Sequence, residues 1–166
     1  MIKINRTRRI ALLTLVFISI LALNITGCGK DAPVATLKVG ESYTQGSWII
    51  TVTEAKVSST LKSLLGTLPA KSEKQFVLVS ISFENTLSER ALISFEALLP
   101  YLLADKDGKY GLSDAGYEVL DNPFPYGYVE AGNTMTGVFP FEIPAVSKDL
   151  VLSVLFNGET ILWELD

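Results

Sequence analysis

Residues 76–85 read Phe-Val-Leu-Val-Ser-Ile-Ser-Phe-Glu-Asn, and from Val77 onward apolar side chains alternate with mostly polar ones. Neighbouring side chains of a β-strand point to opposite faces of the sheet, so this alternation predicts a strand with one buried face and one largely solvated face. The buried face is expected to hold Val77, Val79, Ile81 and Phe83. Residues 48–53, Trp-Ile-Ile-Thr-Val-Thr, have the same period and predict a second strand of this kind.

Five further strands are predicted from short apolar segments bounded by turn residues. They are expected at 92–95, 101–104, 134–143, 150–156 and 160–164. Asn157-Gly158 joins the last two segments, and this pair accepts the positive φ angles of a two-residue hairpin turn. Asp105-Lys106-Asp107-Gly108 predicts another reverse turn. Short strands with turns between them and little helix predict an all-β domain of two packed antiparallel sheets.

One segment departs from the strand pattern. Leu61, Leu64, Leu65 and Leu68 recur at the spacing of one helical face after Thr60, with Gly66 as a possible stop. This spacing predicts a short amphipathic helix. We expect the helix to cover an open edge or end of the sandwich, with a surface for a partner or for the bilayer as the alternative.

The first 27 residues have the anatomy of an export signal. Lys3, Arg6, Arg8 and Arg9 precede a 14-residue apolar stretch at 10–23. As a helix the stretch would cover only ~21 Å, which is short of the ~30 Å hydrocarbon core of a bilayer. The pattern therefore favours a signal peptide over a permanent transmembrane anchor.

Ile25-Thr26-Gly27-Cys28 follows the apolar stretch and contains the only cysteine of the chain. The pattern resembles the bacterial lipobox, in which an aliphatic residue and two small residues precede a cysteine. We expect cleavage between Gly27 and Cys28 and lipidation of Cys28. The resemblance implies a diacylglyceryl group there, and two acyl chains hold a protein stably on a membrane. The alternative is an ordinary cleaved signal with an incidental cysteine.

These signals divide the chain into three predicted parts. Residues 1–27 are the lipoprotein signal peptide, 28–36 the lipidated cysteine with its tether, and 37–166 the β-sandwich domain. The tether contains Lys30, Asp31 and Pro33 and has no apolar period, so it reads as an irregular linker. The mature part is one domain's worth of sequence and is long enough to bury a single core.

Composition argues against several function classes. Without residues 1–27, ten basic and 18 acidic residues remain, a net charge of −8. A nucleic-acid partner is therefore not expected, because phosphate binding needs clustered Lys and Arg. The chain has no histidine, which excludes Ser-His hydrolase triads and His-ligated zinc sites. We expect no cofactor, no metal and no disulfide.

An aromatic loop supplies the best candidate for a binding surface. Five of the six tyrosines lie between Tyr101 and Tyr128, and residues 123–128 alternate prolines with aromatic rings. Rigid aromatic side chains bury area at low entropic cost and suit sugar faces or a protein partner. We predict a binding loop with Phe124, Tyr126 and Tyr128 as its contacts. Alternatively, Phe124 and one tyrosine plug the end of the sandwich.

The connecting region before this loop is acidic. It contains Asp105, Asp107, Asp114, Glu118 and Asp121. Carboxylates could supply oxygen ligands to calcium, but the spacing is not that of an EF-hand loop. The favoured interpretation is a solvated set of turns. A general acid and base pair would need a pocket that the sequence does not indicate.

The turn and strand motifs of the predicted sandwich resemble those of a known family. The motifs are a Gly-x₅-Gly-Ser-Trp segment at 40–48, the strand at 76–85, an Asp-x-Asp-Gly turn at 105–108, Thr-Gly-Val-Phe at 136–139 and Phe-Glu-Ile-Pro at 141–144. This pattern is similar to an immunoglobulin-like family of bacterial secreted and lipid-anchored proteins of unknown function. Its superfamily is named for a mycobacterial immunoprotective extracellular antigen. The resemblance implies an immunoglobulin-like β-sandwich over 37–166 and no catalytic residues.

Together these patterns predict a lipid-anchored binding or interaction module of a bacterial cell surface. It would lie on the cell membrane, face away from the cytoplasm and act without catalysis. Its membrane contact would be the lipid on Cys28, and its partner another surface protein or an envelope polymer. The alternative is an accessory structural subunit of a membrane-associated complex.

Overall fold

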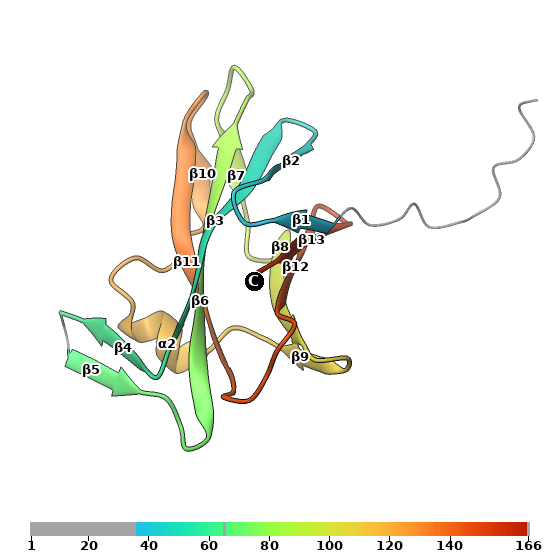
Figure 1. Cartoon of the computed structure of the whole chain (residues 1–166). Coiled ribbons are helices and arrows are strands. Elements are labelled where there is room, and N and C mark those ends of the chain that lie inside the picture. Colours follow the sequence, from blue (N-terminus) through green and yellow to red (C-terminus); the bar gives the residue numbers. More distant parts are fainter. Residues whose placement is uncertain (1–35, 65, 166) are drawn as a thin grey trace, which may run out of the picture. The chain divides into compact units, whose positions relative to one another are not determined.

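The alternating run forms most of strand β6 (Lys74–Asn85) in the computed structural model, which describes residues 36–64 and 66–165. β6 pairs antiparallel with β11 (Thr134–Pro144) on one side and with β3 (Trp48–Ser58) on the other. β2 (Ser42–Gln45) lies antiparallel beyond β3. The order of this four-stranded sheet is therefore β11–β6–β3–β2 (Figure 1).

A second, five-stranded sheet faces the first. Its strands, in spatial order, are β1 (Thr36–Lys38), β13 (Glu159–Glu164), β12 (Val151–Phe156), β8 (Leu98–Ala104) and β9 (Gly108–Tyr110). β1 pairs parallel with β13, and the other neighbours are antiparallel. The predicted hairpin turn between β12 and β13 is confirmed, because Asn157 and Gly158 have φ angles of 47° and 83°. The predicted turn at residues 105–108 connects β8 with β9.

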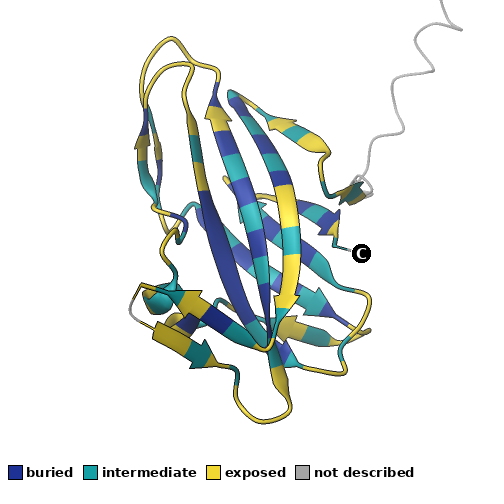
Figure 2. Cartoon of the chain, turned by 60° about the vertical axis from the view of Figure 1, so that its left-hand side comes forward, coloured by how far each residue is buried: buried dark blue, intermediate teal, exposed yellow. Residues whose placement is uncertain are grey.

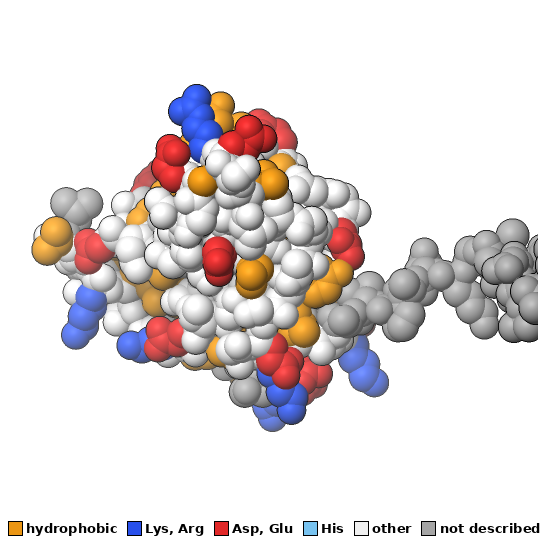
Figure 3. All heavy atoms as spheres, turned by 90° about the horizontal axis from the view of Figure 1, so that it is seen from above, with side chains coloured by type: hydrophobic (Ala, Val, Ile, Leu, Met, Phe, Trp, Pro, Cys, Tyr) orange, Lys and Arg blue, Asp and Glu red, His pale blue; other side chains and the backbone are white. Residues whose placement is uncertain are grey.

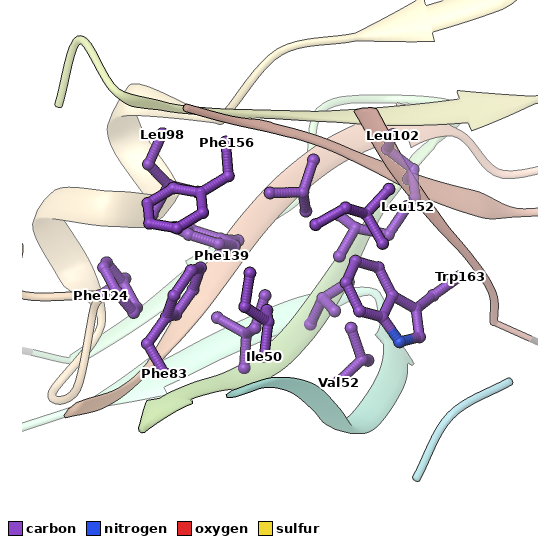
Figure 4. Close-up of a cluster of buried hydrophobic side chains, with 14 of the residues drawn as sticks. Ile50, Val52, Phe83, Leu98, Leu102, Phe124, Phe139, Leu152, Phe156 and Trp163 are labelled. Carbon is purple, nitrogen blue, oxygen red and sulfur yellow. The ribbon is translucent and has the colours of Figure 1, made fainter. Parts of the chain in front are cut away.

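The core lies between the two sheets. Figure 4 shows Ile50, Val52, Phe83 and Phe139 from the first sheet against Leu98, Leu102, Leu152, Phe156 and Trp163 from the second. Buried and partly exposed residues alternate along β6, as Figure 2 shows for its length. Val77, Val79, Ile81 and Phe83 are all at most 1% exposed, so the predicted inner face of this strand is confirmed. The predicted all-β sandwich with one short helix is confirmed as well.

The helix is not where the leucine spacing placed it. β4 (Thr60–Ser63) and β5 (Gly66–Pro69) pair antiparallel as a hairpin, in which Leu61 lies opposite Leu68. Two residues seven positions apart lie on one helical face, but they are also cross-strand partners when a tight turn lies midway between them. Leu61 is buried and Leu64 is 95% exposed, while Leu65 lies outside the described residues. The prediction of a helix at 61–68 is therefore wrong.

The short helix is α2 (Asp114–Val119), which lies beside the β4–β5 hairpin (Figure 1). Ser113 caps its N-terminus, since the Ser113 hydroxyl accepts a hydrogen bond from the Gly116 amide at 3.2 Å. A Cβ atom on Gly116 would lie 3.0 Å from Pro140 and 3.3 Å from Leu61. Close packing at this glycine therefore seats α2 between strand β11 and the hairpin.

Candidate functional site

A surface depression of about 470 Å³ opens between α2 and the loops that flank the small sheet of β7 (Ala91–Ile93) and β10 (Gly127–Val129). It is lined by Phe95, Leu112, Asp114, Tyr117, Glu118 and Tyr126, and we call it the aromatic pocket. Phe95 follows β7, Tyr126 precedes β10, and the other four residues lie on α2 or directly before it. The volume falls within the range of about 300–1,000 Å³ that is typical of ligand sites.

Two rings of the pocket meet at a steep angle. The Phe95 and Tyr126 ring centroids are 5.4 Å apart, and their planes are inclined by 62°. Behind them the Tyr126 ring packs edge-on against Phe124, with centroids 5.1 Å apart. Phe95 is 58% exposed, whereas Phe124 is fully buried. The pocket wall is therefore an aromatic corner that is fixed to the core on its inner side.

The segment that carries Tyr126 is held along the edge strand β11. The Phe124 amide donates to the Val138 carbonyl at 3.2 Å, and the Val138 amide donates to the Asn122 carbonyl at 3.0 Å. The Tyr117 hydroxyl also donates to the Phe124 carbonyl. These bonds satisfy part of the open edge of β11, which would otherwise expose unpaired backbone groups. They also fix the loop against helix α2.

Asn85 holds the far end of the small β7–β10 sheet. It is the one buried polar residue among the residues that the structure describes, with no exposed surface. Its side-chain amide donates to the Glu89 carbonyl at 2.8 Å and to the Val129 carbonyl at 3.0 Å. Its side-chain oxygen accepts from the Leu87 amide at 3.0 Å. Asn85 thus ties the loop before β7 to the end of β10, at the opposite end of this strand pair from Phe95 and Tyr126.

The charged side chains that line the pocket are all acidic. Asp114 and Glu118 are exposed and lie one helical turn apart on α2, and no Lys or Arg is among the residues that line the depression. Burial raises the pKa of Tyr117, and burial together with the nearby Tyr117 raises the pKa of Tyr126. Both phenols are therefore neutral at physiological pH, and the charge of the pocket comes from its two carboxylates.

The Tyr126 hydroxyl is buried and has no hydrogen-bond partner within the described part of the chain. Removal of this hydroxyl therefore leaves no other polar group without a hydrogen-bond partner. We therefore expect Tyr126→Phe to leave the melting temperature unchanged or slightly higher in a thermal unfolding scan. A loss of more than about 1 kcal/mol would show that the hydroxyl has a partner in solution.

The profile of the family described as "Domain of unknown function (DUF4352)" matches residues 37–161. The chain belongs to the DUF4352 family. This membership, with the solved structures below, confirms the predicted family resemblance. No curated protein matches the sequence closely enough to indicate a relative.

Several solved structures resemble this DUF4352 domain. An uncharacterized β-sandwich protein of Clostridium difficile is 16% identical, with a TM-score of 0.59 over 85% of this chain and 100% of its own. The secreted protein MPT63 of Mycobacterium tuberculosis is 16% identical, with a TM-score of 0.52 over 81% of this chain and 99% of its own. A candidate lipoprotein of Bacillus subtilis, ycdA, is 12% identical, with a TM-score of 0.52 over 78% of this chain and 38% of its own. At these identities the likeness shows the sandwich fold.

The predicted binding loop of the DUF4352 domain is split between three environments. Phe124 is buried in the core, Tyr126 forms a half-buried wall of the aromatic pocket, and Tyr128 is 59% exposed on β10. The Arg90 guanidinium lies 4.6 Å from the centre of the Tyr128 ring and covers one of its faces. The structure thus places only Tyr126 in the pocket, and it adds Phe95 and Tyr117, which the sequence analysis did not select.

The predicted acidic region is split as well. Asp105 and Asp107 line a separate depression beside the β8–β9 turn, whereas Asp114 and Glu118 line the aromatic pocket. A carboxylate oxygen of Asp121 accepts a hydrogen bond from the Leu64 amide at 3.2 Å. Over residues 36–64 and 66–165, no three Asp, Glu, His or Cys side chains are grouped closely enough to hold a metal ion.

The predicted cleavage site at Gly27 and the lipidation site at Cys28 lie outside the described residues, as do the signal peptide and nearly all of the tether. Within the described part of the DUF4352 chain, no helix has the length and apolar character needed to span a bilayer.

Proposed function

We propose that this protein is a lipid-anchored binding module on the outer face of a bacterial cell membrane, and that it acts without catalysis. The observation that carries the binding role is the aromatic pocket, in which Phe95, Tyr117 and Tyr126 are presented on a rigid sandwich. An exposed phenyl ring beside a depression is costly to solvate and useful for contact with a ligand.

The anchor is supported by the order of signals before the domain. A basic start, an apolar stretch and Ile25-Thr26-Gly27-Cys28 follow one another within the first 28 residues. Among proteins of this fold, MPT63 is named as secreted and ycdA as a candidate lipoprotein. An extracytoplasmic place for the domain agrees with both names.

Cys28→Ser is expected to abolish partitioning into the detergent phase when the full chain is expressed in a bacterium that processes lipoproteins. Serine offers no thiol for the diacylglyceryl group, and the chain then lacks the two acyl chains of a stable anchor. Phase separation in a cloud-point detergent measures the loss, and mass spectrometry of the amino terminus identifies the lipid.

Thr26→Ser is the matched control, because it keeps a small residue before the cysteine and should retain the lipid. Unchanged partitioning of Cys28→Ser would contradict the anchor and would indicate that the apolar stretch itself stays in the bilayer.

The absence of catalysis is supported by the site chemistry. The whole chain lacks histidine, and Asp114 and Glu118 are both exposed to solvent at the pocket. A carboxylate that acts as a general acid near neutral pH needs burial or a like charge at close range to raise its pKa. Solvated carboxylates suit charge recognition better than proton transfer.

The accessory-subunit alternative would be favoured by a flat apolar face that includes Leu61, but Leu61 is only 1% exposed. Figure 3 shows the end of the sandwich that carries the β6–β7 loop, where hydrophobic side chains stand singly or in small groups among polar surface. The coloured part of this face offers no broad apolar area. Leu61 is therefore not part of an exposed apolar face, and the aromatic pocket favours the binding module.

The binding role is tested by capture of the tagged full chain from detergent-solubilised bacterial membranes after crosslinking. Phe95→Ser removes the exposed wall of the pocket and, because Phe95 is 58% exposed, should leave the fold intact. Val146→Ser is the matched control, since Val146 is 83% exposed and does not line the pocket. A component that is retained by the wild type and by Val146→Ser but lost from Phe95→Ser supports the role. Equal recovery by all three proteins would contradict a macromolecular partner at the pocket.

A further inference from the structure

The shape of the aromatic pocket restricts its ligand. A sugar ring is bound most often across one flat aromatic face, whereas Phe95 and Tyr126 are inclined by 62° with centroids 5.4 Å apart. A corner of this kind contacts a compact, rounded group on two sides. Quaternary and alkylated ammonium groups are compact and rounded, and aromatic cages are the known way to bind them.

The charge of the pocket points to the same ligand. Asp114 and Glu118 are four positions apart on α2, so both carboxylates lie on one face of the helix. They are the only charged side chains among the six residues that line the depression. An anionic ligand would be repelled, whereas a cation gains a Coulombic attraction from the two carboxylates that an uncharged ligand lacks.

Cations already cover other tyrosine rings of this molecule. Arg90 lies 4.6 Å from the centre of the Tyr128 ring, and the Lys109 ammonium lies 3.8 Å from the centre of the Tyr101 ring. Within the described part of the chain, these are the only two cation–π pairs, and neither involves a ring of the aromatic pocket. The rings of the pocket thus lie next to two carboxylates, and no described Lys or Arg side chain makes a cation–π contact with them.

We propose that the aromatic pocket binds a small organic cation, an alkylammonium ion free in solution. This inference rests on the proposed binding function and names the ligand class of the same site. The aromatic corner contacts the alkyl groups and attracts the positive charge, while Asp114 and Glu118 at the rim add long-range attraction that salt weakens.

The test compares two probes of equal shape on the full chain in detergent. Choline carries a trimethylammonium group, and 3,3-dimethyl-1-butanol has a carbon atom in place of the nitrogen and no charge. Titration followed by NMR of the tyrosine rings gives both affinities. We expect choline to bind about tenfold more tightly than the neutral analogue, with weaker binding at higher salt.

Variants measure the contributions of the rings and of the carboxylates to choline binding separately. Phe95→Leu keeps apolar area and should weaken choline binding about threefold or more, while Phe95→Trp should bind at least as tightly as the wild type, because Trp is the strongest cation–π partner. Asp114→Asn with Glu118→Gln should weaken binding about fivefold. Glu84→Gln with Glu130→Gln removes the same charge from exposed residues away from the pocket and should change the affinity less than about twofold.

Equal affinity for choline and its neutral analogue would overturn the inference, because it would show an apolar pocket without charge selection. Tighter binding of N-acetylglucosamine than of choline would overturn it in favour of a carbohydrate site. Binding of none of these probes would overturn it too, and the proposed binding function would still stand if membrane capture depended on Phe95. If choline does not bind and membrane capture does not depend on Phe95, both proposals are contradicted.

Discussion

Val79→Asp is expected to prevent folding of the domain. Val79 is completely buried in the centre of β6, where it lies opposite Phe139 on β11 and Ala55 on β3. A carboxylate at this position finds no described hydrogen-bond donor within the apolar core. Burial of such a group without a partner costs several kcal/mol, and a domain of this size has only about 5–15 kcal/mol of stability. Circular dichroism and size-exclusion chromatography should show an unfolded or aggregated chain.

Thr136→Asp is the matched control for this substitution. It puts the same carboxylate on the neighbouring strand β11, at an exposed position that lies opposite Ser82. The control should fold and should melt within a few degrees of the wild type. A cooperative melt of Val79→Asp near the wild-type temperature would show that the inward face of β6 in solution is not the one that carries Val79.

The inward faces of β3 and β6 could be predicted from sequence, because their periodicity is strong and local. β6 alternates over most of its length and β3 over residues 48–52, and a shift of one residue would move every apolar side chain of such a run to the solvent face, whereas residues 137–141 of β11 are all buried. The short strands β1, β2, β9 and β10 carry three or four residues each. Such lengths give too little pattern to distinguish a strand from a loop, so these elements were not predicted.

The segment at 60–69 shows how local spacing can mislead. Leu61 and Leu68 satisfy both a helical face and a cross-strand pair, and the choice between them depends on what each leucine packs against. In the structure Leu61 lies beneath α2, which follows some 50 residues later in the chain. The real helix had a signal in Ser113 followed by Asp114, a typical N-terminal cap with an acid in the first turn. Its six residues and Gly116 weaken that signal.

The pocket could be predicted only in part, because it is assembled from distant segments. Residues 123–128 were selected for their aromatic rings, and Tyr126 does form a wall. Phe95 ends the strand that the sequence predicts at 92–95, since nothing local distinguishes an exposed phenylalanine from a core one. Its position next to Tyr126 follows from the pairing of β7 with β10, in which Ile93 lies opposite Gly127. That pairing joins residues more than 30 positions apart.

Gly137→Ala is expected to cause a large loss of stability. A Cβ atom at Gly137 would lie 2.3 Å from the Phe124 Cα atom and 2.8 Å from its amide nitrogen, so backbone rather than a flexible side chain must move. Residues 122–124 are held against β11 by two hydrogen bonds with Val138, one made by the Asn122 carbonyl and one by the Phe124 amide. We expect a cost of about 3 kcal/mol or more and a fall in melting temperature of about 10 °C.

Gly111→Ala is the matched control, because a Cβ atom there meets nothing within 4 Å and Gly111 does not have a positive φ angle. It should leave the melting temperature within a few degrees of the wild type. Equal stability of Gly137→Ala and Gly111→Ala would show that residues 122–124 do not lie against β11 in solution.

Gly137→Ala is also expected to disturb the pocket more than the core of the domain. The two sheets do not depend on the 122–124 segment for their own pairing, so a weakened Gly137→Ala protein should keep its β-sheet circular dichroism at low temperature. Displacement of Phe124 from Gly137 shifts Tyr126, whose ring packs 5.1 Å from that of Phe124. Choline binding should therefore fall about tenfold or more in protein that is still folded. Retained binding with reduced stability would show that the aromatic corner holds its shape without the close contact at Gly137.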